Sequence, residues 1–256
     1  MTPRCPYHGT KVRNEQMRAN MFLLAEYETE TGALVGIYDD MLDQVAKALN
    51  KRIKADLMNC IVITGRTGSG KSTLAITLAK KLDPDFDIES IYVYSSTDFL
   101  EKLKTLDTNT SPIWLIDEGS YILNSKNAMA RHDKFLTIAL DTLRSRHITA
   151  IITLPSLFNL NRSVRDHMID YLMMCPDRAL LPGYKKRGFF EVYRPVNQKW
   201  SDKIFWQLLG AGVYKPLDED TDKVYQKLKR DAQNRLIAAF TEGLEDAATD
   251  NRAESD

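Results

Sequence analysis

The sequence predicts an α/β fold built on a mainly parallel sheet. Short apolar runs alternate along the chain with segments of helical periodicity, which is typical of strand–helix–strand units. Each run is apolar enough to be covered on both faces, as the strands of a parallel sheet are. A chain of 256 residues with 43% hydrophobic residues can build one large domain with a sizeable core and extensions, or at most two small domains.

The expected core spans residues 58–198. Its strands are predicted at Cys60–Thr64, Ser90–Ser95, Pro112–Asp117, Ile148–Leu154 and Ile169–Cys175. Its helices are predicted at Lys71–Leu82, Ser96–Thr105, His132–Arg146 and Asn161–His167. The segment Gly188–Arg194 alternates aromatic and polar residues, which predicts an edge or hairpin strand.

Helical patterns flank this core on both sides. Residues 1–57 are expected to form a tail and a helical region, with helices at Glu15–Ala25 and Tyr38–Ala55. Residues 199–243 are expected to form a C-terminal helical extension, whose last helix runs from about Glu219 to Gly243. With the predicted hairpin strand, this makes a C-terminal strand–helix extension.

Charge and cysteine content narrow the class of protein. The 35 basic and 35 acidic residues balance, so no global electrostatic footprint for nucleic acid is present, although a local basic strip remains compatible. The acidic tail, residues 244–256, is expected to be disordered.

The three scattered cysteines, Cys5, Cys60 and Cys175, indicate a reducing compartment. No run approaches 18 apolar residues and no signal peptide is evident, so we expect a cytoplasmic protein without membrane insertion.

The segment Gly65–Ser72 fits the pattern G-x-x-x-x-G-K-[ST] at every fixed position. It follows an apolar strand and precedes a helix, which is the context that a phosphate-binding loop needs. Glycines let several backbone N–H groups meet triphosphate oxygens, and the helix dipole adds positive potential. Lys71 is predicted to pair with the β- and γ-phosphates. The predicted nucleotide-binding residues are Gly65, Arg66, Thr67, Gly68, Ser69, Gly70, Lys71, Ser72 and Thr73.

A second motif follows the strand that ends at Ile116. Asp117 and Glu118 are adjacent acids after a buried apolar strand, an arrangement that is costly unless a cation is near. We expect Ser72 and Asp117 to hold Mg²⁺, and Glu118 to polarise the attacking water as catalytic base. An exposed acidic turn is the alternative. ATP and Mg²⁺ are therefore the predicted cofactors.

At this point the sequence resembles the additional-strand, catalytic-glutamate division of P-loop ATPases. The resemblance implies a P-loop NTPase three-layer sandwich in which a fourth strand lies between the two motif strands. A polar residue at the end of that strand senses the γ-phosphate, and Thr153 stands at this position.

Residues 58–195 look most like the FtsK/HerA superfamily of DNA-translocating and genome-packaging ATPases. The residues that carry the likeness are Asp117-Glu118-Gly119, Leu143-Arg144-Ser145-Arg146, Thr153-Leu154-Pro155-Ser156 and Leu160-Asn161-Arg162-Ser163-Val164-Arg165. Threonine replaces the family's usual glutamine at residue 153. The resemblance implies an arginine finger, with Arg144 and Arg146 as candidates and Arg162 and Arg165 as weaker ones. Solvated helix-end arginines are the alternative.

The resemblance also implies a homo-oligomer that acts on DNA, in packaging or transfer. The best local patch for DNA is Lys185-Lys186-Arg187 with Phe189 and Phe190, although a charged hairpin turn has the same composition. Two other functions stay open. One is an ATP-dependent switch or loading factor acting on a protein partner, and the other is a small-molecule kinase.

Overall fold

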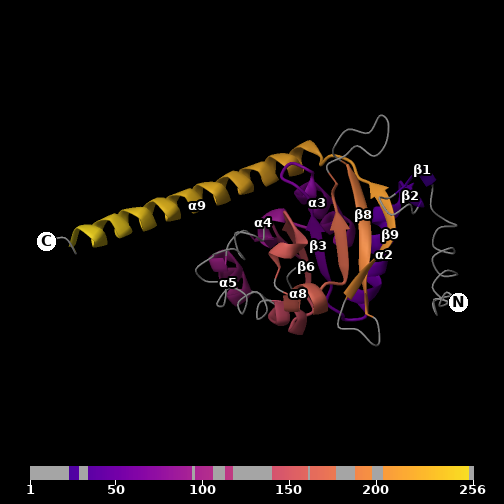
Figure 1. Cartoon of the computed structure of the whole chain (residues 1–256), viewed down its shortest axis with the longest axis horizontal. Coiled ribbons are helices and arrows are strands. Elements are labelled where there is room, and N and C mark those ends of the chain that lie inside the picture. The colour runs from indigo at the N-terminus through magenta and orange to yellow at the C-terminus, as the bar shows by residue number, and fades with distance from the viewer. Residues whose placement is uncertain are drawn as a thin grey trace, which may run out of the picture. The chain divides into compact units, whose positions relative to one another are not determined.

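The computed structural model describes residues 23–28, 34–93, 96–105, 113–117, 140–160, 162–176, 188–197 and 204–253 (Figure 1). Its contacts divide the chain into two compact units. The first holds residues 1–86 and 91–216, and the second holds residues 87–90 and 217–256.

The strands are β1 (Leu23–Glu28), β2 (Leu34–Tyr38), β3 (Cys60–Thr64), β4 (Tyr92–Val93), β5 (Ile113–Ile116), β6 (Thr149–Leu154), β7 (Tyr171–Met174), β8 (Phe189–Asn197) and β9 (Ile204–Val213). The helices are α2 (Met41–Lys54), α3 (Lys71–Leu82), α4 (Ile88–Ile91), α5 (Ser96–Thr105), α8 (Arg162–His167) and α9 (Glu219–Ala253). A 3₁₀ turn, η1 (Leu157–Asn159), precedes α8, and residues 140–145 are also helical.

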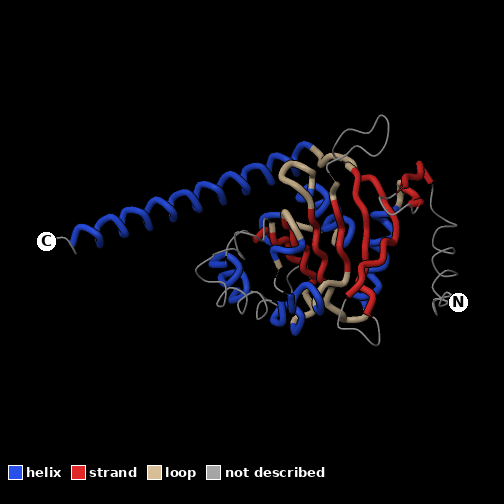
Figure 2. The backbone as a smooth tube through the Cα atoms, in the orientation of Figure 1, coloured by secondary structure: helices blue, strands red, loops and turns tan. Residues whose placement is uncertain are grey.

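The nine strands form one sheet in the order β1-β2-β9-β8-β7-β3-β6-β5-β4 (Figure 2). The strands from β7 through β3, β6 and β5 to β4 are parallel, which confirms the predicted parallel core. β8 and β9 extend the sheet from β7 as an antiparallel hairpin. β6 lies between β3 and β5, so the predicted insertion of a strand between the two motif strands is correct.

Helices cover both faces of this sheet. Alternate residues of a strand face opposite sides, so Cys60 and Val62 of β3 point to one layer and Ile61 and Ile63 to the other. Cys60 and Val62 belong to a buried cluster that includes side chains from residues 140–143 and from α8. Helix α3 contacts β3, β5 and β6. The fold is therefore the predicted α/β three-layer sandwich of P-loop NTPases.

Two predictions about the flanks are wrong. Residues 23–25, predicted as helix, begin strand β1, which pairs with β2 ahead of α2. Residues 204–213, which lie in the predicted helical extension 199–243, form strand β9 instead. It continues the sheet beyond residue 198 and pairs with β8 as an antiparallel hairpin, so the hairpin alternative predicted for Gly188–Arg194 is correct and the edge-strand alternative is not.

One core strand is also shorter than predicted. Within the predicted strand Ser90–Ser95, the chain is helical through Ile91 in α4, Tyr92 and Val93 form β4, and residues 94 and 95 lie outside the described residues. This short strand still pairs with β5, at Tyr92–Leu115 and Val93–Ile116. Tyr92 therefore lies on the strand next to β5, and Asp117 directly follows β5.

The second unit contains the long helix α9. The side chain of Asp218 accepts hydrogen bonds from the backbone N–H (2.9 Å) and the hydroxyl (2.7 Å) of Thr221, which caps the start of the helix. Acidic residues in the first turn, including Glu219, stabilise the helix because their negative charge interacts favourably with the positive end of the helix dipole. The helix runs to Ala253, so it continues past the predicted end at Gly243 and through most of the expected disordered tail.

In the described part of the chain, no helix is both long enough and apolar enough to cross a lipid bilayer.

Candidate nucleotide-binding site

The loop between β3 and α3 has the backbone that the glycine pattern predicts. Gly70 has a φ of 96°, in the left-handed region, and is the N-cap of α3. A Cβ atom at Gly70 would collide with the hydroxyl oxygen of Tyr214. A Cβ atom at Gly65 would lie 2.5 Å from the carbonyl oxygen of Cys175 and 2.6 Å from Ser69 Oγ. Both positions therefore require glycine.

The start of α3 leaves its backbone donors available for an anion. The N-cap residue is Gly70, and no side chain caps the helix. The first amide groups of a helix have no partner inside the helix, and together with the helix dipole they form an anion site. The loop before α3 is closed by a hydrogen bond of 3.1 Å from the Ser69 N–H to the Arg66 carbonyl oxygen.

Lys71 and Ser69 place polar side-chain atoms in the same loop. The ammonium group of Lys71 donates to the carbonyl oxygen of Arg66 at 2.9 Å, and Lys71 is buried. The hydroxyl of Ser69 is buried and has no hydrogen-bond partner among the described residues. A buried hydroxyl without a partner is unusual. The residues present therefore fit a bound phosphate, which would supply acceptors for these donors.

Asp117 is the meeting point of three secondary-structure elements beside the loop. Ser72 of α3 donates its hydroxyl to Asp117 Oδ1 at 2.8 Å, and Thr153 of β6 donates to the same oxygen at 2.7 Å. Tyr92 of β4 donates to Asp117 Oδ2 at 3.1 Å. Asp117 is only 1% exposed. The predicted metal residues, Ser72 and Asp117, and the predicted sensor, Thr153, are thus in direct contact.

This arrangement fits a magnesium ion that takes most of its ligands from phosphate and water. In the described ranges, no group of three or more His, Cys, Asp or Glu residues could hold a metal ion. Mg²⁺ characteristically uses one or two protein oxygens together with substrate phosphates and water. The Ser72 hydroxyl and the Asp117 carboxylate would be those protein oxygens.

Of the remaining predicted site residues, Glu118 lies outside the described residues. Arg144 and Arg146 precede β6, whereas Thr153 stands near its end. A strand rises about 3.3 Å per residue, so the two arginines lie at the edge of the sheet opposite the phosphate loop of their own chain. Arg146 donates from Nη1 to the Leu103 carbonyl oxygen at 3.3 Å.

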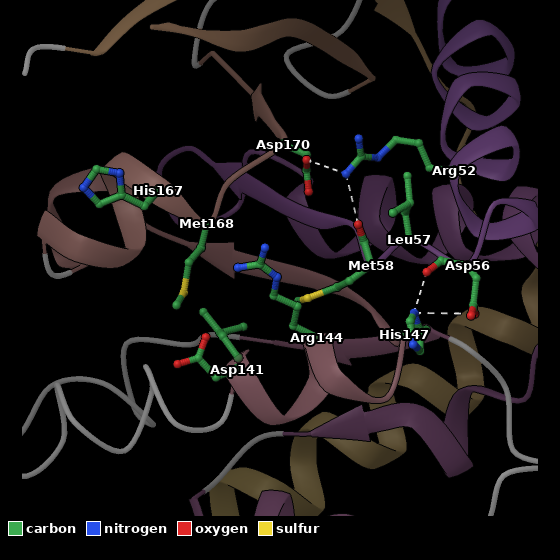
Figure 3. Close-up of a pocket in the computed structure, with 11 residues that line it drawn as sticks. Arg52, Asp56, Leu57, Met58, Asp141, Arg144, His147, His167, Met168 and Asp170 are labelled. Carbon is green, nitrogen blue, oxygen red and sulfur yellow. Dashed lines mark hydrogen bonds and ion pairs between the residues drawn. The ribbon is translucent and has the colours of Figure 1, made fainter. Parts of the chain in front are cut away.

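Arg144 borders a cavity of about 250 Å³ at that opposite edge. Figure 3 shows its side chain near those of Met58 and Met168. Asp170 lies in the same cavity and is paired with Arg52, whose Nη2 is 2.8 Å from Asp170 Oδ1. Burial raises the pKa of Asp170, and the Cys60 N–H, Arg52 and Arg144 oppose this rise.

The weaker arginine candidates and the predicted DNA patch have different surroundings. Arg165 lies over the ring of Phe158 at 5.6 Å and donates to Asp166 at 3.1 Å. Phe189 and Phe190, predicted to accompany a basic DNA-binding patch, are both buried and cannot stack on bases. The basic residues of that patch, 185–187, lie outside the described residues.

Sequence reasoning missed two tyrosines at this site. Tyr92 could have been found, because it lies in a predicted strand whose carboxyl end shares an edge with Asp117. Tyr214 follows β9, and its hydroxyl donates to the Gly70 carbonyl oxygen at 3.0 Å. No motif or spacing links residue 214 to the loop, so only the folded structure reveals it.

Comparisons with known proteins give likenesses of fold only. No protein-family model matches the chain, and neither does any curated protein. Among solved structures, AMPPCP-bound DnaA from Aquifex aeolicus aligns at 17% identity and a TM-score of 0.37, over 54% of this chain and 46% of that one. The DNA-packaging ATPase of Sulfolobus turreted icosahedral virus aligns at 18% identity and a TM-score of 0.37, over 64% and 98%.

A KaiC-like protein from Pyrococcus horikoshii aligns at 13% identity and a TM-score of 0.33, over 61% of this chain and 90% of that one. The aligned part spans less than half the length of the replication initiators. At these identities and TM-scores, the activity of the chain has to be argued from its own residues.

Proposed function

We propose that the chain binds ATP with Mg²⁺ and hydrolyses it. The observation that carries this proposal is the pair of hydroxyls, from Ser72 and Thr153, that share Oδ1 of Asp117 beside the phosphate loop. These two bonds bring three segments together at one buried oxygen. The segments are the first turn of α3, the residue that follows β5, and the end of β6, which lies between β3 and β5 in the sheet. Such a meeting of hydroxyl and carboxylate next to an anion site suits a phosphate-bound cation.

Each residue has a distinct part in the proposed reaction. The N–H groups of the loop and the Lys71 ammonium would bind the phosphate oxygens, and Lys71 would exchange its present bond to the Arg66 carbonyl for them. When bound, Mg²⁺ would neutralise phosphate charge. Thr153 would hold the Asp117 carboxylate in place. Glu118, the next residue, is proposed to accept a proton from the attacking water.

We further propose that hydrolysis drives nucleic-acid translocation by an oligomer. Support comes from the resemblance over residues 117–175 to translocating ATPases and from the position of Arg144. Its guanidinium makes no hydrogen bond with any described residue, and it lies far from its own phosphate loop. A finger from Arg144 or Arg146 would therefore have to reach the γ-phosphate on a neighbouring subunit.

Phosphate release tests both parts of the proposal. We expect release from ATP with Mg²⁺, stimulated by double- or single-stranded DNA and abolished by Lys71→Ala and Glu118→Gln. Lys81→Ala is the matched control, because Lys81 is on the same helix but pairs with Asp43 on the surface. Full activity in Lys71→Ala would refute the phosphate site. Comparing phosphate release from ATP with release from GTP and CTP would show which nucleotide base the site prefers.

Two further outcomes identify the rival functions. Slow release that ignores DNA, together with a nucleotide-dependent protein complex, would favour a switch or loading factor. A phosphorylated acceptor with little free phosphate would favour a kinase. Release without DNA stimulation would leave the hydrolysis proposal standing and remove the translocation proposal.

A further inference from the structure

Tyr214 joins the phosphate loop to the last strand of the sheet. It directly follows β9, and its hydroxyl lies 3.0 Å from the carbonyl oxygen of Gly70 and 3.4 Å from that of Ser69. The Gly70 oxygen also accepts the first helical hydrogen bond of α3, from the Leu74 N–H at 3.0 Å. A carbonyl oxygen has two lone pairs, so it can accept both bonds.

Holding these two carbonyls fixes the direction of the amide groups on the other side of the same peptides. In a planar trans peptide, the C=O and N–H bonds point in opposite directions. The peptide of Ser69 carries the N–H of Gly70, and the peptide of Gly70 carries the N–H of Lys71. The hydroxyl has one proton, so its bond to the Gly70 oxygen at 3.0 Å is the main one and its contact with the Ser69 oxygen at 3.4 Å is a weak, shared one. When the hydroxyl holds the Gly70 oxygen, the Lys71 N–H is turned away from Tyr214, and the Gly70 N–H is held in the same way but more weakly.

The tyrosine is itself held in place. Its ring packs against Phe190 of β8, with ring centroids 6.0 Å apart, and Tyr214 is buried. Its backbone N–H donates to the Gly188 carbonyl oxygen at 2.8 Å. The ring is therefore anchored by the hairpin, and the hydroxyl is the part that reaches the loop.

We propose that Tyr214 is a positioning residue for phosphate binding, which preorganises the Gly70 and Lys71 amides of the loop. This inference rests on the proposed function, because it assigns a role to the same phosphate site. It predicts that the hairpin β8–β9, which lies outside the parallel core, completes the nucleotide site. Preorganisation raises affinity by removing the cost of ordering the loop when the ligand binds.

The test compares Tyr214→Phe with the native protein and with Tyr193→Phe. Tyr214→Phe keeps the ring and removes only the hydroxyl. Tyr193 belongs to the same hairpin, but its hydroxyl donates to Glu191 at 2.6 Å, so Tyr193→Phe removes a hydroxyl bond that does not involve the loop. Dissociation constants are measured by calorimetry for Mg–ATP and for Mg–tripolyphosphate, a probe that has phosphates and no base.

We expect Tyr214→Phe to weaken both ligands by about three- to tenfold, the range set by one net hydrogen bond. Tyr193→Phe should bind both as the native protein does. A purely structural role would lower the melting temperature of both variants without changing either dissociation constant. Unchanged affinity for Mg–tripolyphosphate in Tyr214→Phe would overturn the proposal.

Hydrogen exchange of the ligand-free protein separates this inference from the proposed function. The loop amides of residues 66–71 should exchange faster in Tyr214→Phe than in Tyr193→Phe. If the native protein binds neither ligand, the nucleotide-binding proposal fails, and faster exchange would still show that Tyr214 orders the loop. Equal exchange in the two variants would refute the role of Tyr214 whatever the ligand result.

Discussion

The hydroxyl of Thr153 donates a hydrogen bond of 2.7 Å to Oδ1 of Asp117. Thr153 comes from β6, the strand between the one that leads into the phosphate loop and the one that ends at Asp117. Both residues are almost fully buried. The position of the carboxylate is consequently set by protein donors rather than by water.

Replacing Thr153 by valine should lower the turnover number for ATP by about tenfold or more. The variant removes one donor to a buried carboxylate, and hydrogen bonds to charged groups contribute about 1.5–3 kcal/mol. Phosphate release at saturating ATP measures the effect. Thr153→Ser keeps the hydroxyl and should retain most of the activity. Native turnover in Thr153→Val would show that this bond does not serve catalysis.

Replacing Asp117 by asparagine should raise the Mg²⁺ concentration needed for half-maximal activity by about tenfold or more. An amide is a weaker ligand for Mg²⁺ than a carboxylate because it carries no charge. The measurement is phosphate release titrated with Mg²⁺ at constant ATP. Asp43→Asn, an exposed acid paired with Lys81, is the control and should leave the titration unchanged. An unchanged Mg²⁺ requirement in Asp117→Asn would place the ion elsewhere.

Asp170 should make the stability of the fold fall as the pH rises. Burial raises its folded pKa above the ordinary value of 3.8, so the folded chain binds the proton more tightly than the unfolded chain. Its contribution to stability is fully present below pH 3.8 and is lost as the pH rises through the folded pKa.

Urea unfolding of the native protein and of Asp170→Asn, from about pH 3.5 to about pH 7, tests this sign. The free energy of unfolding of the native protein, minus that of the variant, should fall with pH and then level off. A difference that increases with pH would mean that Arg52 lowers the pKa more than burial raises it.

Cys60 and Cys175 should resist alkylation in the folded protein. Both thiols are buried, and burial raises the pKa of Cys175 to about 12 despite the opposing effects of Tyr214 and Lys71. At about pH 8 the Cys175 thiol is therefore almost entirely protonated, and the thiolate is the reactive form. In a Cys5→Ser background, mass spectrometry should find both cysteines unmodified until urea is added. Rapid labelling of native Cys175 would contradict this prediction.

The phosphate site was predictable from sequence because its elements are local. The bounds of β3 and α3 agree with the predicted Cys60–Thr64 and Lys71–Leu82, since a loop motif fixes the end of one and the start of the other. The meeting of Ser72, Asp117 and Thr153 follows from a general rule. The carboxyl ends of parallel strands share one edge of the sheet, so polar residues at those ends converge.

Strand β9 was not predictable in the same way. Its sequence, Ile204–Val213, shows no regular alternation and contains two glycines, which weaken a strand pattern. The reason for Gly212 lies in the fold. A Cβ atom there would be 2.6 Å from Met41 Cβ of α2 and 2.8 Å from the Phe190 ring. Close packing by distant residues, rather than local preference, therefore accounts for this strand.

The bond between Tyr214 and Gly70 spans 144 positions of sequence, and this separation has a consequence for biosynthesis. Contacts between distant residues form late, because a long loop must close before they contribute. A chain still on the ribosome can contain β3, the loop, α3, β5 and β6 before β9 has emerged. Such a nascent chain would carry every motif of the phosphate site without the hydroxyl that orders the loop. High-affinity nucleotide binding would then arise only once β9 and Tyr214 have left the ribosome, later than the phosphate-loop motifs themselves.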